Sequence, residues 1–238
     1  MVFDNQGNYV TENEYAHGFE NSATALKLNG GLTYTFIAYS TNSKETLPEV
    51  AYANNIKNLS SATITVNGDQ DLMYFSKSLQ VAGDKETFLG VSLKHKLSQI
   101  TTIIDATQTN YHITNIQSSI NATREKLSLN LSDGVATAFG SSFPASVIFP
   151  TLPVLSTAKS TPTYINAPAG NNYSYIIDKI KVGFTEKTNI TAFSHLTIMP
   201  GVKYNMKITI SPGDDYFYIG ELPKYPVVRI GDQVWMRV

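Results

Sequence analysis

The chain has 238 residues, of which 42% are hydrophobic and only 16% are charged, and its net charge is −1. A charge balance this close to zero excludes a protein that binds DNA, RNA or acidic lipid mainly through its electrostatic field. The chain contains no cysteine, which excludes disulfides, thiolate metal sites and a cysteine nucleophile.

Asn, Ser and Thr together supply 65 residues, a composition more typical of secreted or cell-surface β proteins than of cytosolic enzymes. The length suits one large β domain or two of ordinary size. No apolar run approaches the roughly 20 residues that a membrane-spanning helix needs, so we expect no embedded membrane segment. The start, MVFDNQGNYV, lacks the features of a signal peptide, and we expect a mature or trimmed soluble fragment.

The dominant hydrophobic period is two, which predicts β-strands. Residues 32–40 (LTYTFIAYS) are rich in aromatic and β-branched residues and follow a glycine turn. One or two short helices near Pro48–Asn58 are the only helical structure expected. Residues 61–69 (SATITVNGD) predict a strand that ends at an Asn-Gly turn, with three apolar residues on one face: Ala62, Ile64 and Val66.

The second half of the chain shows the same alternation. Residues 126–134 (KLSLNLSDG) place Leu127, Leu129 and Leu131 on one face. Residues 195–211 predict two strands around Pro200–Gly201, the second of which alternates Tyr204, Met206, Ile208 and Ile210. Many short strands at regular spacing predict an all-β protein built from antiparallel sandwiches.

A polar stretch near residues 82–87 separates two strand-rich segments and is interpreted as a linker. The predicted organisation is an N-terminal β-sandwich domain at residues 1–84, a C-terminal one at 85–213, and a tail at 214–238.

The histidines offer little support for catalysis, and the common nucleophile, zinc and nucleotide motifs are absent. His95 alternates with apolar residues in VSLKHKLS, so it is either an acid/base group or ligand, or a histidine at the edge of the core. The second interpretation is favoured, with a hydrogen bond to backbone or hydroxyl. The remaining histidines lie in polar, turn-like contexts and are expected on the surface: His17, His112 and His195.

The acidic residues are likewise interpreted as structural. Asp69 and Asp71 resemble part of a calcium loop, but the required glycine and distal glutamate are missing, which favours turn chemistry. Asp214 and Asp215 are adjacent on an expected strand and would point to opposite faces, so they do not form a glycosidase pair. The aromatic residues that follow could stack on a sugar, but packing against a sheet is favoured: Tyr216, Phe217 and Tyr218. We expect no enzyme, cofactor or metal site.

The last residues, VVRIGDQVWMRV, predict a hairpin around the turn Gly231–Asp232. In that register Val228 lies opposite Trp235, Arg229 opposite Val234, and Ile230 opposite Gln233. Both faces are then apolar, so each needs a partner surface. The tail is predicted to add strands to a sheet edge or to be exchanged between molecules. The candidate interaction residues are Tyr216, Phe217, Tyr218, Val228, Ile230, Trp235 and Met236.

Four motifs together resemble the fimbrillin-like surface proteins of gut-type Gram-negative bacteria. They are LNGGLTYTFIAYSTNSKETLP, with its glycine turn, Y-x-F-x-A-Y and Leu-Pro; the strand DLMYF; VSLKHKLSQITTII, with L-x-H-x-L-S; and LTIMPGVKYNMKITI, with P-G-x-x-Y-N. Their order and spacing cover roughly residues 20–212.

This resemblance implies two transthyretin-like β-sandwiches in tandem, exported as a lipoprotein and displayed on the outer surface. Many members polymerise by strand exchange after an arginine-directed cut near the N-terminus. The chain has no arginine before Arg124, which favours an accessory or tip-like subunit. The ending PVVRIGDQVWMRV resembles the opening of a FISUMP-type module, which predicts that this module is truncated here.

The leading hypothesis is therefore a fimbrillin-like cell-surface protein, in the outer membrane or a fimbria, that acts in adhesion or fimbrial assembly. The implied partners are other fimbrial or surface subunits or a surface receptor on a host or bacterium. The alternative is a carbohydrate- or peptide-binding β-sandwich module of a secreted or outer-membrane capture protein.

Overall fold

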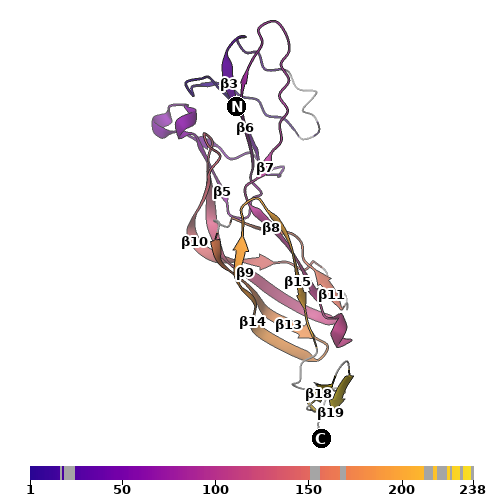
Figure 1. Cartoon of the computed structure of the whole chain (residues 1–238). Helices are drawn as coiled ribbons and strands as arrows, with labels where there is room; N and C mark the ends of the chain where they lie inside the picture. The colour runs from indigo at the N-terminus through magenta and orange to yellow at the C-terminus, as the bar shows by residue number, and fades with distance from the viewer. Residues whose placement is uncertain are drawn as a thin grey trace.

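The structure is a computed structural model that describes residues 1–16, 18, 25–150, 156–166 and 170–211. It also describes four short strands between residues 217 and 236; for these, and at positions 122, 170 and 171, only the backbone is described. The fold is all-β, as expected, with tandem β-sandwiches (Figure 1). The only helical elements in these residues are single 3₁₀ turns, η2 (Ala53–Asn55), η3 (Leu59–Ser61) and η4 (Thr107–Thr109). The first two lie at or just after the segment where short helices were expected.

The first sheet belongs to the N-terminal end of the molecule. Its five strands pair in the order β2 (Tyr9–Thr11), β1 (Val2–Phe3), β3 (Thr33–Ser40), β6 (Met73–Gln80) and β7 (Lys94–His95).

The second sheet is the longest and runs through the middle of the molecule. Its main path is β14 (Thr185–Ile198), β13 (Gly170–Val182), β9 (Ile113–Asn130), β5 (Thr63–Asn67) and β4 (Val50–Ala51). Strand β10 (Ala136–Val147) pairs with the other side of β9.

The third sheet packs over β13, β14 and the first part of β9, and together these strands form the C-terminal sandwich. Strand β8 (Ser98–Asp105) pairs on one side with β11 (Thr157–Lys159) and β12 (Thr163–Ile165), and on the other with β15 (Lys203–Thr209). The β8–β15 pair is parallel, whereas every other described pair is antiparallel. In the tail, β16 (Phe217–Tyr218) pairs with β17 (Lys224–Tyr225), and β18 (Val227–Ile230) with β19 (Gln233–Met236).

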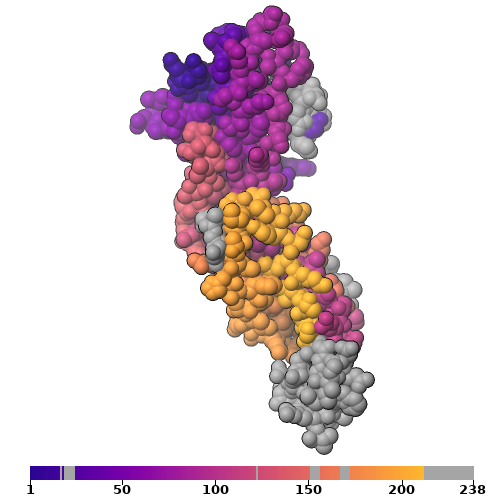
Figure 2. All heavy atoms as spheres, viewed as in Figure 1, coloured from indigo at the N-terminus to yellow at the C-terminus, as the bar shows by residue number. Residues whose placement is uncertain are grey.

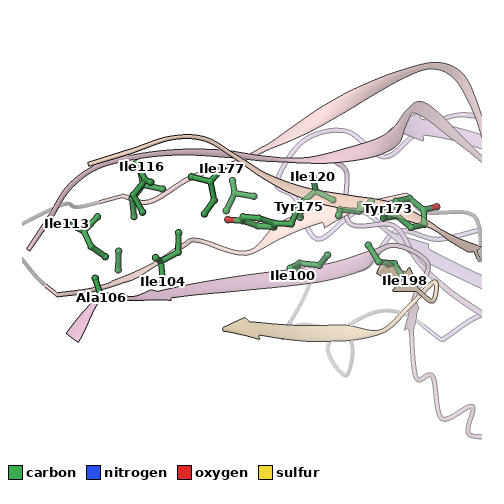
Figure 3. Packing of buried hydrophobic residues seen from close by; sticks show 14 residues of the cluster. Ile100, Ile104, Ala106, Ile113, Ile116, Ile120, Tyr173, Tyr175, Ile177 and Ile198 are labelled. Carbon is green, nitrogen blue, oxygen red and sulfur yellow. The ribbon is translucent and has the colours of Figure 1, made fainter. Parts of the chain in front are cut away.

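Each sandwich has its own hydrophobic core. The C-terminal core lies between the second and third sheets, where side chains of both layers point toward one another (Figure 3). The N-terminal core lies between the first sheet and the other end of the second. Its buried residues are Phe3, Ile37, Ala62, Ile64, Val66, Leu72, Tyr74, Leu97, Leu127, Leu129 and Leu131.

Strand β9 is shared by the two cores. Leu127 and Leu129 pack in the N-terminal core, whereas Ile113, Ile116 and Ile120 of the same strand pack in the C-terminal one. The expected face of alternating leucines is therefore confirmed, but the strand is much longer than its leucine pattern indicates. The segment boundaries 1–84, 85–213 and 214–238 remain a prediction, and a test of them has to take account of this shared strand.

The junction between the sandwiches depends on Asn166, which follows β12 and is almost fully buried. Strands β5 and β13 pair with the same side of β9 but leave a gap near Arg124. The Asn166 carboxamide fills this gap. Its Oδ1 accepts a hydrogen bond from the Arg124 N–H (2.8 Å), and its Nδ2 donates to the carbonyls of Arg124 (2.6 Å) and Lys126 (3.2 Å). One side chain thus replaces a strand at this point of the ladder.

Gly68 is needed at the same place. Its N–H donates to the Glu125 carbonyl (2.8 Å), which extends the β5 pairing by one residue past the strand end. A Cβ atom on Gly68 would lie 2.1 Å from the Arg124 carbonyl oxygen and 2.7 Å from Asn166 Nδ2. Such a contact is sterically forbidden. The predicted Asn-Gly turn therefore requires glycine at position 68, because β9 lies so close to it.

We predict that Asn166→Leu lowers the free energy of unfolding by about 2 kcal/mol or more, because it leaves paired backbone groups of β9 without partners in a buried place. Chemical denaturation measures this change. The exposed Asn5→Leu is the matched control and should stay within about 0.5 kcal/mol of the parent protein. Equal effects of the two substitutions would contradict the role given to Asn166.

Candidate assembly edge of the C-terminal sandwich

The two long sides of the C-terminal sandwich differ. On the side of β10 and β12 the layers are joined by hydrogen bonds. The Thr161 N–H donates to the carbonyl of Ile148 (2.8 Å), and the Thr161 hydroxyl donates to the same oxygen (3.2 Å). These bonds link the two layers at one point of this side, where β10, β11 and β12 each also have an edge without a strand partner in the described residues.

The opposite side is open. Strand β14 ends the second sheet and strand β15 ends the third, so each has one edge without a strand partner in the described part of the chain. The two strands lie on the face of the molecule visible in Figure 2, in neighbouring shades of orange. An unpaired edge presents a row of N–H and C=O groups to which another strand can bind.

A groove lies between these two edges. Its volume is about 240 Å³. Most of its lining is apolar, and it comes from β14, β15 and the β8 residue behind them: Ile100, Phe193, Leu196, Ile198, Tyr204 and Met206. The sequence pattern identified the strand alternation at 204–210 but not this groove, because it does not reveal which strands become neighbours.

The turn between β14 and β15 is fixed at one end of the groove. Ser98 Oγ donates to the Met199 carbonyl (2.7 Å), and the Met199 N–H donates to the Tyr204 hydroxyl (2.9 Å). Gly201 has a φ of +73°, and a Cβ there would lie 2.6 Å from the His95 carbonyl oxygen. The two strands expected around Pro200–Gly201 are thus confirmed, but they pair with different sheets and not with each other.

The direction of the β15 backbone groups follows from two hydrogen bonds. The Ile210 N–H donates to the Asp105 carbonyl, and the Val202 carbonyl accepts from the Gln99 N–H. The backbone N–H and C=O groups of these two even-numbered residues therefore point toward β8. Since backbone groups alternate in direction along a strand, those of Asn205 and the other odd-numbered residues point toward the open edge.

An ion pair that includes the groove-lining residue Lys207 joins β15 to the end of β8. Lys207 Nζ lies 2.9 Å from Asp105 Oδ2. This hydrogen bond, with those from the Thr107 hydroxyl and N–H to Oδ1, holds the pKa of Asp105 well below its ordinary value. The charged form of the carboxyl is therefore the one that supports the β8–β15 pair.

His95 and Asp71 form a contact that the sequence pattern does not reveal. His95 Nδ1 lies 2.7 Å from Asp71 Oδ1, and Asp71 is buried whereas the His95 side chain is 53% exposed. The expectation of a core-edge histidine bonded to backbone or hydroxyl is wrong about the partner, because β7 pairs with β6 and places His95 opposite Met73, two residues after Asp71. Asp71 also accepts from Asn42 Nδ2 (3.4 Å), so its role extends beyond its own turn.

The structure describes only some of the other histidines, aspartates and aromatic residues that the sequence analysis considered. His112 and His195 are exposed, as expected, while His17 lies outside the described residues. Among the described residues no group of three or more His, Cys, Asp and Glu side chains could hold a metal ion. Asp214, Asp215 and Tyr216 lie outside the described residues, and only the backbone of Phe217 and Tyr218 is described.

The expected terminal hairpin is present in backbone register. Val228 pairs with Trp235, Arg229 with Val234, and Ile230 with Gln233, as the sequence predicted, and Val227 pairs with Met236. The turn Gly231–Asp232 lies outside the described residues. The interaction role of Val228, Ile230, Trp235 and Met236 stays a prediction.

A sequence model of the family described as "Fimbrillin-A associated anchor proteins Mfa1 and Mfa2" matches residues 1–231 of the chain. Curated protein sequences give no match.

Solved structures share the fold. A candidate adhesin from Bacteroides thetaiotaomicron is 12% identical, with 99% of this chain and 88% of that chain covered and a TM-score of 0.55. A candidate polysaccharide-binding protein from the same species is 10% identical, with 100% and 88% covered and a TM-score of 0.51. At such identities the likeness extends to the fold alone.

We predict that Lys207→Gln lowers the melting temperature at neutral pH and that its effect depends on pH in one direction. A carboxyl whose pKa is lowered on folding stabilises the protein above its unfolded pKa, here near 3.8, and loses that contribution as the pH falls. The difference in melting temperature between the parent protein and the variant should therefore have its full size above pH 4 and decrease below it. Thermal unfolding from pH 2 to 7 measures it, and a difference that grows in acid would contradict the assignment.

Proposed function

Because the chain belongs to the family of fimbrillin-A associated anchor proteins Mfa1 and Mfa2, we propose that it is an accessory subunit of a surface fimbria. It is a fimbrial or adhesion-type protein of the cell surface. We propose in addition its position in the fimbria and the way in which it attaches to other subunits. The single observation that supports this attachment is the open edge formed by β14 and β15 with the apolar groove between them.

Strand addition is the mode of binding that this edge favours. A strand from a fimbrillin-type subunit would form main-chain hydrogen bonds with β15, and its alternate side chains would fill the groove. Each buried apolar side chain would contribute roughly 1.5–3 kcal/mol before the cost of ordering the strand. The outward N–H of Asn205 is one donor that such a strand would use.

The edges of the C-terminal sandwich are protected to different degrees. Strand β10 contains Pro144, a glycine at positive φ and two register shifts, all of which discourage a further strand. Strand β15 pairs with β8 in unbroken register from Lys203 to Thr209 and contains neither proline nor glycine. This regular edge is the better template for a partner.

The location and the tail complete the proposal. We infer attachment at the outer face of the outer membrane, as an exported lipoprotein, with the last residues as the beginning of a FISUMP-type module. The role is attachment and not catalysis, in keeping with the family description. No helix among the described residues has the length and apolar character that a bilayer crossing requires.

We predict that Asn205→Pro reduces incorporation into surface filaments about tenfold or more, since it removes an outward N–H and adds a ring at the edge without breaking a bond to β8. Immunogold electron microscopy of cells that express each variant measures incorporation. Asn205→Thr is the matched control: it keeps the N–H, places a residue that strands accommodate well at the edge, and should be incorporated like the parent protein.

Two results would contradict the proposal in different ways. Normal incorporation of the proline variant would show that attachment does not use this edge. Absence of the parent protein from all surface filaments would show that it is not a fimbrial subunit.

A further inference from the structure

We infer that the strand which adds to β15 carries acidic residues at alternate positions, so that its carboxylates meet the lysines of the third sheet while its apolar residues fill the groove. The inference rests on the proposed function in taking the β15 edge as the attachment surface. It goes further by stating which side chains the partner strand carries and from which kind of chain this strand comes.

The partner strand pairs with β15 and not with β14, because the edge of β14 is irregular. Asn189 and His195 of β14 have positive φ (55° and 56°) although neither is glycine. The register between β13 and β14 also shifts at three places. Such irregularities interrupt the row of edge groups that a further strand needs. A strand added to β15 lies about 4.8 Å from it within the third sheet, so its inward side chains point across the groove toward Phe193 and Leu196 of β14.

The charged residues of the third sheet all lie on its outer face. They are three lysines and one aspartate, which leaves two positive charges in excess: Lys159, Lys203, Lys207 and Asp105. Ladder pairing determines this placement, since Lys207 and Lys159 both lie opposite Ile103, one on each side of β8. Directly opposed residues share a face, and the residues that alternate with them pack in the C-terminal core.

The two lysines of β15 can both bind a further carboxylate. Lys203 is exposed and forms no ion pair with any described residue. Lys207 donates to Asp105, but its ammonium group has three protons and its side chain is 60% exposed, so a second carboxylate can approach it. An acidic residue opposite either lysine therefore meets an opposite charge, whereas a basic residue there meets a like charge.

The spacing of these lysines specifies the pattern of the partner strand. Lys203 and Lys207 are four positions apart, and Tyr204 and Met206 between them line the groove. The matching strand therefore has two acidic residues at the ends of a five-residue window and apolar residues at the second and fourth positions of that window. This pattern is the same when read in either direction, so it fits an added strand that is parallel or antiparallel to β15.

The 238 residues of this chain contain no such window. Among its 19 acidic residues only Glu45 and Glu49 are four positions apart. The second position of that window is Thr46, and the fourth is Pro48, which has no N–H to donate to a ladder. The partner strand therefore belongs to a different subunit of the fimbrillin type and not to a second copy of these residues.

Two synthetic peptides and the purified full chain test the inference. The first peptide, Thr-Glu-Val-Thr-Val-Glu-Val-Thr, has the expected pattern, and the second has lysine in place of both glutamates. At low ionic strength we expect the glutamate peptide to bind at least about tenfold more tightly, as measured by fluorescence anisotropy of the labelled peptides. This preference should decrease in about 0.5 M salt, because salt screens exposed charges.

Charge reversal in the protein assigns the preference to β15. Lys203→Glu should reduce the preference for the glutamate peptide at least about threefold. Lys44→Glu is the matched control: it changes the net charge equally but lies in an exposed loop between β3 and β4, and it should leave the preference unchanged. Asn205→Pro should weaken the binding of both peptides. Equal affinity of the two peptides for the parent protein, or equal effects of the two lysine variants, would overturn the inference.

Hydrogen exchange identifies the strand that receives the peptide. At saturation the glutamate peptide should slow exchange of the outward amides of Asn205 and Lys207 about tenfold and leave the edge amides of β14 unchanged. Slower exchange in β14 instead, or no binding of either peptide, would overturn the inference. Equal affinities with protection at β15 would refute only the acidic pattern, and filament labelling of the Asn205→Pro variant would still decide the fimbrial role independently.

Discussion

The fold depends on one continuous strand that serves two cores. Strand β9 passes from the C-terminal sandwich into the N-terminal one, and its backbone must remain paired where its neighbours change from β13 to β5. The carboxamide of Asn166 pairs with the backbone at that point. Because a buried unpaired peptide group costs about as much as a hydrogen bond provides, the two sandwiches can share a strand only where such a substitute is present.

The same organisation produces the asymmetry between the sides of the C-terminal sandwich. On one side Thr161 bonds to Ile148 and so links the two layers, on the way to β12. On the other side the turn at Met199–Gly201 takes the chain from one layer to the other, so that β14 and β15 diverge from a common end. The edge that we propose for attachment therefore arises from the topology of the sandwich.

The local alternation of apolar residues was sufficient to predict individual strands, but it did not predict which strands pair with each other. The alternation at Ala62, Ile64 and Val66 predicted burial correctly, and the register expected for the terminal hairpin agrees with the pairing of β18 with β19. The parallel neighbour of β15 was not predictable, because its partner is a strand far away in sequence. The Asp71–His95 contact was not predictable for the same reason, because it depends on the pairing of β6 with β7, which the local pattern does not reveal.

The parallel pairing of β15 with β8 also determines when the sandwich can be finished. Strand β8 ends at Asp105, but the strand that shields its second side begins only at Lys203. During synthesis both edges of the isoleucine-rich β8 are therefore unpaired until β11 and β12 have been made, and its second edge is unpaired until β15 has been made. Such late, long-range closure slows folding and prolongs the time during which the apolar face of β8 is exposed to aggregation.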